Sequence, residues 1–195
     1  MISTALFGGS FNPIHRGHVA LAHHVLQSGW ADEVWLMVSP QNPLKESGVL
    51  LPEAFRYELA QRAVSDIDGL QACDFEFGLP RPSYTWQTLE ALGEKYPERR
   101  FRLMIGADNW NCFPHWARHE DLLRHYDILV YPRPGHELPS VGLPPRVHVI
   151  DAPLLDISST DIRRAVLEGR PVGHLLPAKI ATPEIISQLC SLLQK

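Results

Sequence analysis

This chain has few cysteines and no long apolar run, and both shortages narrow what it can be. Its three cysteines, Cys73, Cys112 and Cys190, lie far apart, so neither a disulfide framework nor a cysteine metal site is expected. No stretch approaches the roughly 18 apolar residues that cross a bilayer, so we expect no membrane partner. The chain opens directly on a predicted strand, which predicts no signal peptide and a reduced, cytoplasmic setting.

Positive charge is also scarce. Lys and Arg number 18 against 22 Asp and Glu, which gives a formal net charge of −4 and a pI of about 6.2. Without a polybasic run the chain is not expected to bind nucleic acid. Any phosphate ligand must therefore be held by a few well-placed donors. With 195 residues and 45% hydrophobic content, residues 1–195 are expected to form one domain.

What the chain does contain is an alternation of apolar runs and amphipathic segments. The first strand, turn, helix and second strand together have the size of a βαβ unit with a right-handed parallel crossover. We therefore expect an α/β fold, a Rossmann-like doubly wound parallel sheet with helices on both faces and a small C-terminal helical part over about 157–195. Strands are expected at 3–7, 33–38, 102–105, 127–131 and 147–150, with a weaker or irregular segment at 70–77. Helices are expected at about 17–26, 52–64, 86–92, 157–167 and 177–193.

The helix expected at 52–64 is amphipathic, with a proline and an acidic residue at its start. Its apolar positions are assigned to the core: Phe55, Leu59, Ala60 and Ala63. The same pattern places Arg56 and Arg62 in solvent.

The densest set of chemistry-bearing residues is the stretch 6–18, LFGGSFNPIHRGH. Gly8 and Gly9 follow a buried strand, and without Cβ atoms they let backbone N–H groups approach a ligand. His15 and His18 stand three residues apart, so both imidazoles project from nearly one face where the next helix begins. A helix start favours an anion, and imidazoles can donate to phosphate oxygens. The stretch predicts a phosphate site with catalytic donors, although Gly-Gly is also common in ordinary α/β loops.

Further polar residues are expected at the same edge of the sheet, beyond the C-terminal ends of other strands. Lys45 follows the second strand and suits a phosphate, or it is a solvated loop lysine. Asp108, just after Gly106, is either a carboxylate for a ribose or a simple helix cap. Arg133 also lies at this edge, and Trp116 offers a ring that can stack on a heterocycle.

The helix expected at 86–92 has free N–H groups at its start. Ser83 or Thr85 is expected to cap it, which leaves the N–H groups around Tyr84 and Thr85 available to an anion.

The helix expected at 157–167 is another helix whose start offers free N–H groups. Ser158 and Ser159 are good cap residues, and Asp161 can complete a pair like a capping box with Ser158. Arg163 lies in the first turn, beside free N–H groups. On its own this is an ordinary capped helix. Paired with the stretch at 6–18, it could hold the distal phosphates of a triphosphate.

The run GGSFNPIHRGH resembles the (T/H)xGH signature of the nucleotidyltransferase superfamily. It departs from the common form at Asn12, where many members carry Asp. Asn keeps a side-chain acceptor that can stabilise the turn, so we expect the loop to keep its conformation. We do not interpret Asn12 as catalytic. Nearly the whole chain is similar to the bacterial nicotinate-nucleotide adenylyltransferases, through the segments SPQNPLK, PSYTWQTL, IGADNW with FPHW, YPRPG and ISSTDIRR.

The resemblance implies an enzyme of NAD biosynthesis that joins nicotinate mononucleotide to the AMP part of ATP, giving deamido-NAD and pyrophosphate. It implies His15, His18 and Arg163 as catalytic residues, and Mg²⁺ held mainly by the ATP phosphates rather than by protein side chains. The implied ATP-binding residues are Gly8, Gly9, Ser10, Phe11, His15, His18, Gly106, Asp108, Arg133, Ile157, Ser158, Ser159 and Arg163. The implied residues for nicotinate mononucleotide are Asn42, Lys45, Tyr84, Thr85 and Trp116.

Three alternatives stay open at this point. The acceptor could be nicotinamide mononucleotide, or the chain could be another transferase of this fold that acts on phosphopantetheine or a cytidylyl substrate. From a different class comes a nucleotide-binding regulator that has lost turnover. A homo-oligomer is compatible with the sequence.

Overall fold

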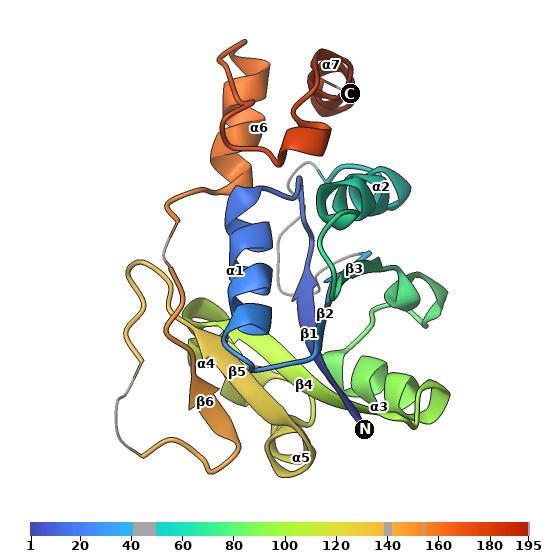
Figure 1. Ribbon diagram of the computed structural model, residues 1–195, viewed down its shortest axis with the longest axis vertical. Coiled ribbons are helices and arrows are strands. Elements are labelled where there is room, and N and C mark those ends of the chain that lie inside the picture. The colour runs from blue at the N-terminus through green and yellow to red at the C-terminus, as the bar shows by residue number, and fades with distance from the viewer. Residues whose placement is uncertain (41–49, 139–141, 154, 195) are drawn as a thin grey trace.

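Six parallel strands form one sheet in the part of the chain that the computed structural model describes, residues 1–40, 50–138, 142–153 and 155–194 (Figure 1). The strands lie in the order β3-β2-β1-β4-β5-β6, so the chain winds outward from the centre of the sheet in both directions. The predicted α/β, Rossmann-like class is thereby confirmed. The bounds are β1 Ile2–Gly9, β2 Glu33–Val38, β3 Leu70–Cys73, β4 Arg99–Gly106, β5 Asp127–Tyr131 and β6 Val147–Val149.

Helices cover both faces of this sheet (Figure 1). They are α1 Arg16–Gln27, α2 Glu53–Val64, α3 Thr85–Lys95, α4 Ala107–Cys112, α5 His119–His125, α6 Ser159–Leu167 and α7 Pro183–Leu193. Three short 3₁₀ turns are η1 Phe75–Gly78, η2 Phe113–His115 and η3 Ala178–Ile180. Among the described helices, none is long and apolar enough to cross a bilayer.

Strand alternation divides the apolar residues into two cores. Ala5 and Phe7 belong to the core that β1 shares with α1, α2, α6 and α7. Leu6, between them, belongs to the core on the opposite face, with α3 and α5. The C-terminal helices α6 and α7 lie together beyond the start of α1 (Figure 1). Residues distant in sequence are thus held beside the stretch 6–18.

Several predicted boundaries differ from the structure. The sheet extends further than the apolar runs suggested, because β1 continues through Gly9 and β4 begins at Arg99. The ambiguous segment at 70–77 is a four-residue strand followed by η1. The last helix begins at Pro183, not at 177. There Thr182 accepts the Ile185 N–H at 3.4 Å, and proline suits the first helical position.

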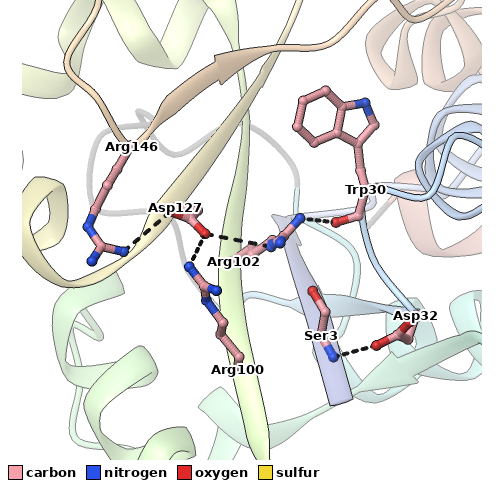
Figure 2. A network of polar contacts seen from close by, with 7 residues as sticks. All are labelled: Ser3, Trp30, Asp32, Arg100, Arg102, Asp127 and Arg146. Carbon is pink, nitrogen blue, oxygen red and sulfur yellow. Dashed lines mark hydrogen bonds and ion pairs between the residues drawn. The ribbon is translucent and has the colours of Figure 1, made fainter. Parts of the chain in front are cut away.

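A network of ion pairs lies where β4 and β5 begin, at the edge opposite the strand ends considered below (Figure 2). Asp127 accepts from Arg100 at 2.7 Å and from Arg146 at 3.3 Å, and the Arg102 guanidinium donates to the Trp30 carbonyl oxygen. These contacts tie the strand starts together and leave the other edge to carry a ligand site.

Candidate active site

A cavity of about 350 Å³ opens at the C-terminal ends of the central strands. Its lining includes Gly8, Gly9 and Ser10 from the end of β1 and Ile105 from β4. β1 and β4 are the neighbours from which the chain winds in opposite directions, and doubly wound sheets bind ligands at this switch point. The cavity therefore stands where the fold alone predicts a site.

The two glycines at the end of β1 serve different neighbours. A Cβ on Gly8 would meet no atom within 4 Å, so this residue leaves space on the cavity side. A Cβ on Gly9 would lie 3.1 Å from the ring of Phe11. Phe11 is buried, has a left-handed backbone with φ of 42°, and packs edge-on against Phe7 and His18. Strained residues of this kind cluster at functional sites. Gly9 thus makes room for the ring that supports His18.

His15 and His18 form a stacked pair at the start of α1, with ring centroids 3.6 Å apart and planes inclined by 23°. The predicted common face of the two imidazoles is confirmed. The backbone N–H of His15 donates to Nδ1 of His18 at 3.2 Å. Neutral His18 therefore carries its proton on Nε2, where it can be donated to a ligand.

Burial changes the protonation of His15. This side chain is 4% exposed, and burial, with a smaller contribution from the Arg133 charge, lowers the pKa of His15 from 6.5 to about 4. His15 is therefore neutral at pH 7. Because the unfolded chain takes up this proton first, the free energy of unfolding falls as pH drops from about 6.5 towards about 4. Above that window the group does not affect stability.

The start of α6 is joined directly to the loop that precedes α1. Ser159 Oγ donates to the Pro13 carbonyl oxygen at 2.9 Å, and Arg163 Nη1 donates to the Asn12 carbonyl oxygen at 2.8 Å. Ser158 accepts the Asp161 N–H at 3.0 Å, so the predicted cap is confirmed. These bonds bring the two predicted anion-favouring helix starts side by side.

The predicted exposure of Arg56 is the principal error of the sequence interpretation. This residue is not in solvent: its side chain is fully buried and, among the described residues, contacts no carboxylate directly. Its guanidinium donates to four backbone carbonyl oxygens, at 2.6–3.0 Å, on Ser10, Ser39, Pro40 and Leu51. Burial lowers the pKa of Arg56 to about 10, so it stays charged at neutral pH. Arg56 thereby fixes Ser10 and Ser39, both of which line the cavity. Arg62 is exposed, as predicted.

The end of β4 carries a close contact that explains Gly106. A Cβ there would lie 2.4 Å from Asp108 Oδ1 and 3.1 Å from the Arg133 side chain. Asp108 Oδ1 and Arg133 Nε are 3.6 Å apart, and neither buried atom has a hydrogen-bond partner among the described residues. Asp108 is not the cap of α4, because Gly106 holds that position. A ligand hydroxyl could satisfy both unpaired atoms.

The start of α3 forms another wall of the cavity, which Ser83, Tyr84, Thr85 and Trp116 line together. The expected cap by Ser83 or Thr85 is wrong, because Tyr84 is the N-cap residue and its N–H donates to Gln87 Oε1 at 3.3 Å. The bond to Gln87 pairs the N–H of Tyr84 itself, so the expectation that this N–H is available to an anion is also wrong. A longer side chain three residues into a helix can reach back in this way. A serine or threonine cap would instead accept an N–H two or three residues further into the helix.

The remaining predicted residues fall into two groups. Ile157 lies with His15, His18 and Arg133 around a narrow cleft of about 40 Å³. Asn42 and Lys45 lie outside the described residues. Within the described part of the chain no three His, Cys, Asp or Glu side chains gather as metal ligands do.

Comparison with known proteins shows the family. A model of the family described as cytidylyltransferase-like matches residues 6–165. A relative from Bacteroides fragilis named "Probable nicotinate-nucleotide adenylyltransferase" is 48% identical over 89% of this chain and 86% of its own length. A Porphyromonas gingivalis protein of the same name is 43% identical over 97% of both chains.

One solved structure of similar fold is Plasmodium falciparum nicotinic acid mononucleotide adenylyltransferase complexed with NaAD. It superimposes with a TM-score of 0.77 at 17% identity and covers 98% of this chain and 96% of its own. At that identity the match supports the fold alone.

Proposed function

The chain belongs to the cytidylyltransferase-like nucleotidyltransferases and, within them, to the nicotinate-nucleotide adenylyltransferase family, and we propose that it transfers AMP from ATP to nicotinate mononucleotide. The products are deamido-NAD and pyrophosphate, in NAD biosynthesis. The observation that carries the proposal is the His15–His18 pair at the start of α1, where bonds to Asn12 and Pro13 hold the start of α6 against the preceding loop. A cavity opens at the switch point of the same sheet.

The chemistry suits these residues because the attacking group needs little activation. The 5′-phosphate of the acceptor is already anionic at neutral pH, so no strong base is required. In the proposed step, an acceptor phosphate oxygen attacks the α-phosphorus of ATP in line, and the bond to the bridging oxygen of pyrophosphate breaks. Positioning and donors to the growing charge then supply the catalysis.

In this proposal His18 donates from Nε2 to the α-phosphate, and neutral His15 supports it by stacking and contacts the phosphates. The starts of α1 and α6 hold the triphosphate, through Gly8, Gly9, Ser10, Phe11, Ile157, Ser158, Ser159 and Arg163. Gly106, Asp108 and Arg133 take the ribose and adenosine. Tyr84, Thr85 and Trp116 take the pyridine ring, with Asn42 and Lys45 on the mononucleotide side.

The hydrogen-bond donors of the site also indicate how Mg²⁺ would be bound. Backbone N–H groups, imidazoles and a guanidinium suit phosphate oxygens rather than a cation. We therefore propose that Mg²⁺ is carried mainly by the phosphates of ATP, as this ion prefers to keep its waters and bind substrate oxygens.

We also propose that residues 1–195 act as one domain, because α6 and α7 share a core with β1 and α1. We also propose a cytoplasmic location, which suits the free state of Cys73, Cys112 and Cys190.

Substrate choice provides a direct test. Nicotinate is an anion and nicotinamide is neutral, so N–H groups at the start of α3 should prefer the acid by about 1–3 kcal/mol or more. We expect kcat/KM for nicotinate mononucleotide to exceed that for nicotinamide mononucleotide by about tenfold or more. Pyrophosphate release measured with ATP and each acceptor, phosphopantetheine included, decides it. Comparable values for acid and amide would refute the preference, and no release with either would refute the function.

A substitution at Gly106 provides a second test, of the proposed binding of ATP. In Gly106→Ala the new Cβ must displace Asp108 and Arg133, so we expect KM for ATP to rise about tenfold, with a smaller change in kcat. Gly93→Ala is the matched control, since a Cβ there meets no atom within 4 Å. It should leave KM unchanged and raise the free energy of unfolding by about 0.5–1 kcal/mol, because Gly93 lies within α3. Equal KM values for the two variants would contradict the role of Gly106.

A further inference from the structure

Glu76 is a buried carboxyl group in the wall of the cavity, and the proposed mechanism does not use it. It lies in η1 and is 8% exposed. It lines the cavity beside Ser83, Tyr84 and Thr85, where the start of α3 is exposed to a ligand. Among the described lining residues it is the one acidic side chain, and none of them is lysine or arginine.

Thr88 connects Glu76 to the start of α3. The fully buried Oγ1 of Thr88 lies 2.8 Å from Glu76 Oε1 and 3.3 Å from the Tyr84 carbonyl oxygen. A hydroxyl has one proton and can donate to only one of these acceptors. When Glu76 is ionised, Thr88 Oγ1 donates to Glu76 Oε1. When Glu76 is protonated, Oε1–H can donate to Oγ1 instead, which leaves the Thr88 proton for the Tyr84 carbonyl oxygen. Protonated Glu76 thus helps to hold the N-cap of α3.

The surroundings favour the neutral acid. Burial raises the pKa of Glu76, and hydrogen bonds from Thr88, Ser39 and Ser83 oppose this only in part. Arg56, a cation whose guanidinium lies at the end of β2, donates to the Ser39 carbonyl oxygen through Nη1 and makes three further bonds to other carbonyl oxygens. The other titratable groups around η1 are Cys73 and Asp74 before it, Tyr57 on α2, Lys95 at the end of α3, and Tyr84 and His115 in the cavity wall.

We propose that Glu76 is a specificity-determining residue for the pyridine carboxylate. As the neutral acid it stabilises the start of α3 that receives this carboxylate, and as the anion it repels it. The inference rests on the proposed function, because it requires an acceptor whose ring carries a negative charge. The neutral amide nucleotide should not experience this repulsion. Ionisation of Glu76 should therefore weaken acceptance of the acid nucleotide alone.

The test is the ratio of kcat/KM for the acid nucleotide to kcat/KM for the amide nucleotide, measured over a pH range that begins near the ordinary glutamate pKa of about 4.3 and rises through neutral pH. Titration of His18, ATP or the acceptor phosphate affects both substrates and cancels in this ratio. In the parent protein we expect the ratio to fall about tenfold as pH rises through the raised pKa of Glu76. In Glu76→Gln, which keeps the shape and a donor, the ratio should not change with pH. Glu90→Gln, an exposed change on α3, should behave as the parent does.

The outcomes separate the two proposals. If neither nucleotide is adenylylated, the proposed function fails. If the acid is adenylylated but the ratio is independent of pH in the parent, or falls equally in Glu76→Gln, the role of Glu76 is overturned and the function stands.

A direct titration does not depend on the variant folding. We expect ¹³C NMR of the Glu76 side-chain carboxyl in the parent protein to report ionisation above the ordinary glutamate range near pH 4.3, because burial raises the pKa of Glu76. Ionisation within that ordinary range would overturn the inference.

Discussion

Replacing His18 with alanine is expected to lower kcat by about two to three orders of magnitude, with a much smaller change in KM for ATP. Loss of one donor to developing charge has an effect of this size in other enzymes. The structure gives the reason for a large effect at His18. Its Nδ1 accepts from the His15 backbone, so Nε2–H is held in one direction rather than rotating freely. Contacts with Phe11 and His15 fix the ring plane as well.

The control for this variant is His23→Ala, a histidine on the same helix that lines neither the cavity nor the narrow cleft. It should retain the parent kcat. Steady-state rates of pyrophosphate release, with urea unfolding to confirm that both variants fold, measure the difference. A His18→Ala enzyme within a few-fold of the parent would show that the imidazole is not the main donor.

The first site motif could be predicted from sequence because its geometry is local. Three residues of spacing place His15 and His18 on one helix face, and a strand ending in two glycines opens the backbone beside them. An uninterrupted run of apolar residues, such as Ala5, Leu6 and Phe7, likewise indicates a strand buried on both faces. Each of these features depends on neighbours within a few residues.

Other features could not be predicted because their partners are distant or unusual. Helical periodicity assigned Arg56 to solvent, but its acceptors include carbonyls 46, 17 and 16 residues away. Glu76 could not be identified from the sequence, because nothing in the neighbouring residues distinguishes a buried acid from an exposed one. At the start of α3, the preference for serine or threonine as the N-cap residue does not predict Tyr84. Here the Gln87 side chain reaches back and accepts the Tyr84 N–H. In each case a side chain satisfies backbone groups that the local pattern does not include.

Arg56→Met is expected to lower the free energy of unfolding by about 3–5 kcal/mol. The methionine removes a buried charge, which by itself is favourable, but it leaves four carbonyl oxygens from separate segments without their shared donor. Each buried acceptor left unpaired costs about 1–3 kcal/mol, and water entry recovers part of this. Arg56→Lys keeps the charge with fewer, less directional donors, so its loss should be intermediate.

Arg62→Met is the matched control, six positions along the same helix. Its guanidinium is half exposed and pairs with Glu58 at 2.6 Å, so its loss should cost no more than about 0.5 kcal/mol. Urea denaturation of the three variants measures the comparison. Equal midpoints for Arg56→Met and Arg62→Met would mean that the four carbonyls find other partners at little cost. If the large difference is found, the loops that carry Ser10 and Ser39 owe their positions to Arg56, since no other described side chain bonds both.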